Sequence, residues 1–445
     1  MKQKRHLHKI VSVLAAAVIL SACGGSPGKA DAEGPNMAAQ SSDVVFFPTE
    51  TQQIRQVGTE DGAGQQAAGA GGIYELVSIL PESCSILYTD YAAGRQVYLC
   101  SSPGCGHAGD YCTSYVDTSL GNIPGLIFSD DRLYLITPAS ADAAFPPQIE
   151  VMDANGANRT VLAKFKASQT ISPGWCLADE KALYFLLEDV QSDGRFTQTL
   201  CAMEKANGAL HKLLELEQGG WIMDGQGSSI YLKSIEEGEA PDRELFATEQ
   251  AFEEACMDAM QAGALHKILK LNVSDPHTLT VVDEWHQNER SGGMLEGKMY
   301  YYDFAQDCFV EKDYETGESK TVNNTTGAAF NQIYVQAVID GKLVFTGVTT
   351  RESDKNHVSS FYVDFANNAA AEIGIMYAHR DRPVVICASD ADNIYAYYDV
   401  TEEEIPFELD GNLEMTVVGR QQLGMISKQD FWGGAASFTP CAPAV

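Results

Sequence analysis

Residues 126–136 read LIFSDDRLYLI: an apolar run, a polar turn with two aspartates, and a second apolar run with a tyrosine near its centre. This pattern predicts two short strands joined by a tight hairpin. The intervals between six such hairpins are 50, 47, 69, 44 and 51 residues, which is too regular for a chain of unrelated domains. The aligned central positions are Tyr134, Tyr184, Tyr231, Tyr300, Val344 and Tyr395.

A second hairpin lies between successive copies of the first. Residues 149–165, IEVMDANGANRTVLAKF, alternate apolar and polar side chains around a turn. Gly156, Gly208 and Gly317 stand where such a turn needs a positive φ. Each repeat therefore contains four short strands, and four-stranded units at this spacing are typical of β-propeller blades. The sequence predicts an all-β protein with a β-propeller fold.

The N-terminal repeat is incomplete, which bears on how the ring closes. Residues 85–99, SILYTDYAAGRQVYL, match a second hairpin that no standard first hairpin precedes. We expect one blade to be built from both chain ends, with the missing strand supplied by residues 414–431. This gives seven four-stranded blades in a single domain over residues 73–445. Six blades are the alternative, if the N-terminal hairpin completes the unit that begins at Pro383.

The longest interval contains an insertion near residues 242–262, which is rich in helix-forming residues. Phe252, Cys256, Ala259 and Met260 follow helical spacing and would form one apolar stripe. We expect a helix that packs on the side of the propeller or serves as a lid or partner-docking element.

The first residues resemble an export signal. A basic head precedes an apolar run at residues 10–20, which is too short to span a bilayer as a helix. Leu20-Ser21-Ala22-Cys23 resembles a bacterial lipobox, which implies a signal peptide over 1–22 and acylation of Cys23. Residues 23–72 are mostly small and polar and predict a flexible tether after the acylated cysteine. We expect a protein on the extracytoplasmic face of the cell membrane that contacts the membrane through its lipid anchor alone.

The charge balance limits the classes of partner. The chain has 30 Lys and Arg against 61 Asp and Glu, with a formal net charge of −31. So acidic a protein will not bind nucleic acid non-specifically, nor an anionic lipid surface through charge. We expect a monomer with a protein or glycan ligand.

Residues 98–112, YLCSSPGCGHAGDYC, gather the chain's densest set of soft metal ligands. Cys100, Cys105, His107 and Cys112 supply three thiols and one imidazole, a set that tetrahedral Zn²⁺ prefers. Four protein ligands would close the coordination sphere, so the zinc would be structural. Because an exported protein can keep disulfides, one or two bridges that also involve Cys84 are the alternative, and reduced thiols are a third.

Three features together resemble an uncharacterised group of β-propeller lipoproteins from Gram-positive anaerobes. They are the lipobox, the Cys/His segment after the first hairpin, and ISKQDFW at residues 426–432. Residues 149–163 also look like the TolB-type, WD40-like propeller repeat. The resemblance implies the fold and the location but no activity.

The chain lacks the H-E-x-x-H, G-x-S-x-G, P-loop and dinucleotide-binding motifs. We therefore predict an extracellular binding or scaffold module for a protein or glycan. The alternative is a hydrolase or lyase that acts on envelope or other polysaccharide with acidic residues at the propeller channel. Trp221, Trp285 and Trp432 are compatible with sugar stacking, and two carboxyls about 5–9.5 Å apart beside an aromatic platform would favour glycosidic chemistry.

Overall fold

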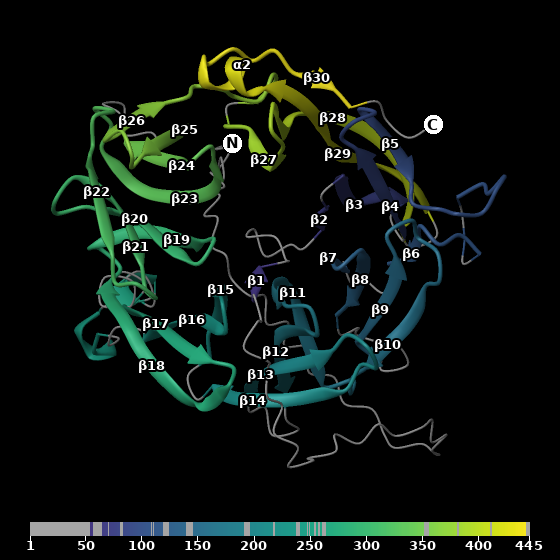
Figure 1. Cartoon of the computed structure of the whole chain (residues 1–445), viewed down its shortest axis with the longest axis horizontal. Helices are drawn as coiled ribbons and strands as arrows, with labels where there is room; N and C mark the ends of the chain where they lie inside the picture. The colour runs from purple at the N-terminus through teal and green to yellow at the C-terminus, as the bar shows by residue number, and fades with distance from the viewer. Residues whose placement is uncertain are drawn as a thin grey trace, which may run out of the picture. The chain divides into compact units, whose positions relative to one another are not determined.

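The computed structural model describes residues 54–441, with gaps at 57–64, 70, 81–82, 108, 110, 119–123, 139–145, 191–195, 217–218, 237–240, 247, 249, 253–254, 257–258, 260–263, 351–355, 381 and 410–411. These residues form seven antiparallel sheets that follow one another around a ring (Figure 1). Each sheet holds at least four strands. The predicted seven-bladed β-propeller is therefore confirmed, and the six-bladed alternative is wrong.

Within each blade, the strands pair with their neighbours in the sequence, and β1 and β6 are additions to this pattern. Blade 1 contains β2 (Gln66–Gly69), β3 (Gly72–Leu80), β4 (Ser83–Asp90), β5 (Arg95–Tyr98) and β6 (Tyr115–Asp117). Blade 2 contains β7 (Gly125–Ser129), β8 (Arg132–Thr137), β9 (Gln148–Asp153) and β10 (Thr160–Lys164). Blade 3 contains β11 (Gln169–Ala178), β12 (Ala182–Val190), β13 (Phe196–Glu204), β14 (Leu210–Leu216) and the upstream β1 (Arg55–Gln56).

The second half of the ring follows the same rule. Blade 4 contains β15 (Trp221–Gln226), β16 (Ser229–Glu236), β17 (Leu265–Asn272) and β18 (Asp275–His286). Blade 5 contains β19 (Arg290–Leu295), β20 (Lys298–Asp303), β21 (Cys308–Asp313) and β22 (Ser319–Asn323). Blade 6 contains β23 (Phe330–Ile339), β24 (Lys342–Thr350), β25 (Asn356–Asp364) and β26 (Ala369–Glu372), and blade 7 contains β27 (Val385–Ser389), β28 (Asn393–Leu409), β29 (Asn412–Ser427) and β30 (Thr439–Pro440).

The aromatic repeat lies on the second strand of blades 2 to 7, where every aligned side chain is at most 3% exposed. Two of its tyrosines also hydrogen-bond to their own hairpin turns. The Tyr184 hydroxyl donates to Asp179 (2.6 Å), and the Tyr395 hydroxyl donates to Asp390 (2.8 Å). Both aspartates also accept backbone N–H groups of their own turns. In blades 3 and 7, an Asp–Tyr pair therefore joins the turn to the blade interior.

The expectation that one blade combines both chain ends is wrong. Blade 1 obtains its innermost strand from β2, and most of residues 414–431 lies in β29, which pairs with β28 and β30 inside blade 7. Side chains instead join the first and last blades. The Tyr397 hydroxyl donates to the buried Glu75 carboxylate, and the rings of Tyr91 and Tyr395 stack at 4.0 Å.

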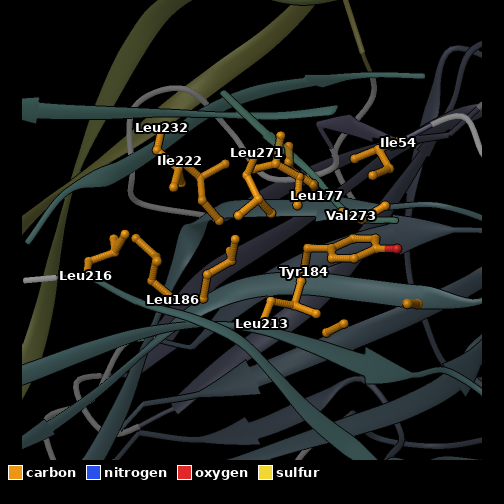
Figure 2. Close-up of a cluster of buried hydrophobic side chains, with 14 residues drawn as sticks. Ile54, Leu177, Tyr184, Leu186, Leu213, Leu216, Ile222, Leu232, Leu271 and Val273 are labelled. Atoms are coloured by element: carbon orange, nitrogen blue, oxygen red, sulfur yellow. The ribbon is translucent and has the colours of Figure 1, made fainter. Parts of the chain in front are cut away.

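The predicted tether, 23–72, is also corrected at its C-terminal part. Ile54 is 2% exposed and packs with Leu177 and Ile222 in the core between blades 3 and 4 (Figure 2). β2 is the innermost strand of blade 1, and a Cβ on Gly69 would lie 3.0 Å from the Phe128 ring. Small residues are needed where β2 approaches this ring so closely, and the same small residues made the segment resemble a flexible linker in composition. The signal peptide 1–22 and Cys23 lie outside the described residues.

The insertion between β16 and β17 is helical at those of its positions that the structure describes. A 3-10 turn, η1 (Arg243–Leu245), precedes helical residues in which Phe252, Cys256 and Ala259 are half-buried on one stripe, as predicted. Met260 lies outside the described residues. A second short helix, α2 (Lys428–Trp432), buries Phe431 and is capped by the Ser427 side chain. Among the helices of the described chain, none has the length and apolarity to cross a membrane.

Strand pairing decides which connections share an end of the propeller. Glu236 pairs with Leu265 where the insertion leaves β16 and enters β17, and Arg290 pairs with Asp303 where β18 passes to β19. In an antiparallel blade, the connection from the second to the third strand and the connection to the next blade lie at one end. We call this the insertion end.

Candidate functional site

The predicted metal ligands lie in an excursion from the outermost strand of blade 1. β5 pairs with residues 87–90 of β4, and β6 pairs with residues 83–85 of the same strand. β5 and β6 are thus two halves of one outer strand, and the chain between them, 99–114, leaves the sheet and returns. This placement puts the excursion on the rim of the propeller, beside the adjoining turn of blade 2, whose Arg159 donates to the carbonyls of Thr113 (3.1 Å) and Tyr115 (2.7 Å).

The structure brings all four predicted ligands together. One ligand atom from each of Cys100, Cys105, His107 and Cys112 lies within 4.8 Å of the other three. The Cys112 Sγ is 3.6 Å from the His107 Nδ1, close to the edge of a tetrahedron built on zinc–ligand bonds of about 2.0–2.3 Å. His107 has a φ of 54°, and this left-handed turn returns the chain toward Cys112.

The local hydrogen bonds favour a thiolate. Burial opposes ionisation of Cys100, but hydrogen bonds to its sulfur from the backbone of Ser102 and from the two neighbouring thiols lower its pKa to about 6. The Ser114 hydroxyl is 3.0 Å from the Cys112 sulfur, and the Tyr98 ring stacks on His107 at 4.4 Å. These contacts orient the ligands, and the donor set can bind a metal ion.

No disulfide joins any two of the ten cysteines in the described chain. Cys84 is buried in β4, opposite Val116, and is not part of the group of four ligands. Cys176, Cys201 and Cys308 are buried in the blades. The other described cysteines, Cys256, Cys387 and Cys441, are half-buried.

A second site, which the sequence analysis missed, is a pocket of about 430 Å³ at the insertion end between blades 5 and 6. It lies between the β20–β21 connection and the chain that leads from β22 into β23. Its walls combine aromatic rings with a carboxylate, an amide and small residues. The lining residues are Tyr302, Phe304, Asp307, Asn324, Gly327, Ala328, Ala329 and Phe330.

Asp307 organises the polar side of this pocket. Its carboxylate accepts hydrogen bonds from the Tyr302 hydroxyl and from the Asn324 amide (2.8 Å), and these bonds lower its pKa. The Asn324 amide also donates to the Ala328 carbonyl (2.7 Å). Both polar groups are therefore held rigidly beside the half-buried Phe304 ring. The sequence feature that could have indicated this pocket is FAQD at residues 304–307. This connection of blade 5 combines an aromatic and an acidic residue and does not follow the alternation of a strand.

Comparisons with known proteins found similarity to solved structures only. No family model matches the chain, and no curated protein matches it. A putative 6-phosphogluconolactonase from Bacteroides uniformis is 12% identical, with 83% of this chain and 97% of that chain covered and a TM-score of 0.39. The β-propeller domain of the Trilobed protease from Pyrococcus furiosus is 11% identical, with 72% and 95% covered and a TM-score of 0.37.

An oligogalacturonate lyase in complex with manganese is 11% identical, with 60% of this chain and 67% of that chain covered and a TM-score of 0.36. At these sequence identities and TM-scores, the similarity to the three structures supports no conclusion about an activity or a bound metal in this chain. The strand pairings themselves establish that this chain is a seven-bladed β-propeller.

Proposed function

We propose that this protein is an extracytoplasmic glycan-binding module, attached to the cell membrane through acylated Cys23. The observation that carries the proposal is the pocket between blades 5 and 6. Its volume of about 430 Å³ is in the range of small-molecule sites, which typically hold about 300–1,000 Å³. Lipid anchoring places the pocket where envelope and extracellular polysaccharides are found.

The chemistry of the pocket suits a sugar. A sugar ring has an apolar C–H face and a polar rim of hydroxyl groups, so it needs a flat apolar surface next to fixed hydrogen-bonding groups. Phe304 supplies a half-exposed ring, while Asp307 supplies an acceptor whose position is already fixed by hydrogen bonds from Tyr302 and Asn324. Binding therefore requires little ordering of side chains, which improves affinity.

Binding is favoured over the alternative of a hydrolase or lyase. Among the described residues that line the pocket, Asp307 is the one carboxylate. Glycoside hydrolysis typically needs two carboxyls, one of which stays protonated as the general acid. The pKa of Asp307 is lowered by its hydrogen bonds, so this side chain is ionised and suited to accept a sugar hydroxyl.

The Cys/His cluster has a structural part in this proposal. We propose that Cys100, Cys105, His107 and Cys112 hold Zn²⁺, which they fit in number, type and spacing. With four protein ligands, no position remains for substrate or water. When bound, the ion would fix the excursion to the rim of blade 1, and the protein would keep this role separate from ligand binding.

The experiment compares two phenylalanine substitutions. Phe304→Ala removes the ring from the pocket, and Phe196→Ala removes a 54% exposed ring from blade 3 as a matched control. Binding of the full chain is measured by calorimetry against soluble muropeptides, β-glucans and xylan oligosaccharides. We expect at least one of these glycans to bind the native protein and Phe196→Ala equally, and Phe304→Ala about tenfold more weakly. No binding to any glycan, or equal binding by both variants, would contradict the proposal.

The location is tested separately. Cys23→Ser should move the protein from the membrane fraction to the medium, because acylation of the Cys23 thiol is the proposed anchor. Retention of the variant in the membrane would rule out this form of attachment without affecting the glycan proposal.

A further inference from the structure

A group of cationic and aromatic side chains gathers at the insertion end between blades 4 and 5. His266 lies opposite Trp285 in the pairing of β17 with β18, and Lys233 lies two residues before the partner of His266 on β16. Directly paired residues and residues two apart on a strand share one face of a sheet. These three side chains therefore project from blade 4 toward blade 5, where Arg290 meets the same indole.

Contacts within the group centre on the Trp285 ring. The Lys233 ammonium lies 5.6 Å and the Arg290 guanidinium 4.1 Å from its centroid, and the His266 ring stacks on it at 5.3 Å. Trp285 is itself 6% exposed. Three nitrogen-bearing side chains thus surround one buried indole.

Two of these polar groups lack a counterpart. Within the described chain, no carboxylate or hydrogen-bond acceptor pairs with the Lys233 ammonium, and its contact is with the indole face. His266 is 5% exposed, and its Nδ1 has no hydrogen-bond partner among the described residues. A half-buried ammonium without a counterion and an unpaired buried imidazole nitrogen both cost folding free energy.

Their electrostatic state reflects this. Burial lowers the pKa of Lys233 to about 8. Burial and the neighbouring Lys233 charge lower the pKa of His266 to about 4, so the imidazole is neutral at pH 7. The side chain of Gln287 hydrogen-bonds to the ring and favours the imidazolium, in which the unpaired Nδ1 is a donor.

The carboxylate that pairs with Arg290 is already neutralised. Asp283 pairs with Arg290 (2.8 Å) and Lys312 (3.1 Å) and accepts from the Tyr314 hydroxyl (2.7 Å). Two cations therefore share one carboxylate, and Lys233 adds a third positive charge. An unbalanced positive group stands out in a chain whose net charge is −31.

We propose that Lys233 and the Nδ1 of His266 bind an oxyanion, either a carboxylate or a phosphate, carried by a small ligand at the insertion end between blades 4 and 5. The anion would pair with the ammonium and accept from the imidazole, which removes both folding costs at once. Trp221, the residue paired with Lys233 on β15, is 42% exposed and supplies an apolar surface for the rest of the ligand.

This site is distinct from the glycan pocket. Tyr301 and Tyr302 are consecutive on β20, so their rings point to opposite faces of blade 5. Tyr301 contacts Arg290 (4.5 Å), whereas Tyr302 lines the glycan pocket. The oxyanion site therefore does not depend on the proposed glycan function, and each can fail alone.

The test uses the full chain with labelled histidine, and a His266→Asn protein assigns the NMR signal of His266. Inorganic phosphate, glucuronate and neutral glucose are titrated separately at concentrations up to about 10 mM, which detects even weak binding. We expect phosphate, glucuronate or both to raise the pKa of His266 by about 1 or more, since a nearby negative charge favours the imidazolium. Glucose should leave it unchanged. A response to one anion alone supports the site and identifies its oxyanion.

Matched lysine variants separate the site from general charge. Lys233→Met should weaken anion binding about tenfold or more, because a charged hydrogen-bond partner is lost. Lys233→Arg should retain binding, and Lys164→Met, which removes an exposed charge on β10, should not change it. Phe304→Ala should also bind the anion normally. The proposal is overturned if neither anion shifts the His266 signal, or if Lys233→Met binds the anion as tightly as the native protein.

Discussion

Zinc binding at the rim of blade 1 can be tested by its dependence on pH. Three thiols must be deprotonated in the zinc complex. Cys100, with a pKa of about 6, is already mostly ionised at pH 7, so binding there displaces protons from the other two. The slope of the logarithm of affinity against pH should therefore be steeper below pH 6, where Cys100 also has a proton to release, than at pH 7–8, where it should be about 2. Competition with a chromogenic chelator under reducing conditions measures this slope.

The same ion should stabilise the fold by mass action. At free Zn²⁺ a thousand times Kd, it adds about 4 kcal/mol to the free energy of unfolding. A domain of this length has an unfolding entropy of roughly 0.8 kcal/mol/K, so the melting temperature should rise by about 5 °C. Differential scanning calorimetry of the reduced protein, with and without Zn²⁺, measures the rise.

Two cysteine variants provide the controls. Cys112→Ser removes the most buried ligand, at 2% exposure, and should abolish both the slope and the thermal shift. Cys256→Ser, in the insertion, changes a cysteine outside the cluster and should preserve both. Zinc that binds Cys112→Ser as well as the native protein, or metal analysis that finds no bound zinc in the native protein, would refute the assignment.

Three further predictions concern the fold. Burial raises the pKa of Glu75, so its ionised form destabilises the native state and stability is lost as pH rises through that pKa. The variant Glu75→Gln should therefore unfold at a higher urea concentration than the native protein at pH 8. This difference in the unfolding midpoint should shrink toward pH 5. Phe345→Ala, at a fully buried ring packed against three other phenylalanines, should lower the free energy of unfolding by about 3–5 kcal/mol in urea titrations. Deletion of residues 1–72 should lower the melting temperature well below that of a chain lacking 1–53, because only the longer deletion removes β1 and β2. The first prediction is contradicted if Glu75→Gln and the native protein have the same pH profile of stability. The second is contradicted if Phe345→Ala lowers the free energy of unfolding by less than 1 kcal/mol, and the third if the two truncated chains melt at the same temperature.

The repeat in the sequence was sufficient to predict the blades because its central side chains are all buried on the second strand, and two of its tyrosines, such as Tyr184 with Asp179, are tied to their own turns. The closure was not predictable in the same way. β2 reads QAAG, which has neither β-branched residues nor clear alternation, and its small side chains reflect the nearby Phe128 ring, which belongs to the next blade. Local propensity contains no information about such a neighbour.

The candidate sites also differ in how far they could be predicted from the sequence. The four proposed metal ligands lie within one excursion of the chain, so their spacing indicated this group before the fold was known. Lys233, His266 and Trp285 come from three strands, and the register of β16, β17 and β18 brings them together. The glycan pocket combines a connection of blade 5 with the entry to blade 6. Both sites depend on pairings and blade contacts that residue types do not specify.

The separation of these sites around the ring has a functional consequence. The Cys/His cluster extends from the outer strand of blade 1, whose neighbours are blades 2 and 7, while both proposed ligand sites flank blade 5. Because interactions between blades involve neighbours, loss of zinc should loosen the rim of blade 1 without moving Tyr301 or Tyr302. Cys112→Ser should therefore bind glycan and oxyanion with native affinity at temperatures where the ring remains folded. Weaker binding at either site, measured by the same calorimetric and NMR titrations, would mean that the cluster is coupled to the ligand sites and is more than a local structural clamp.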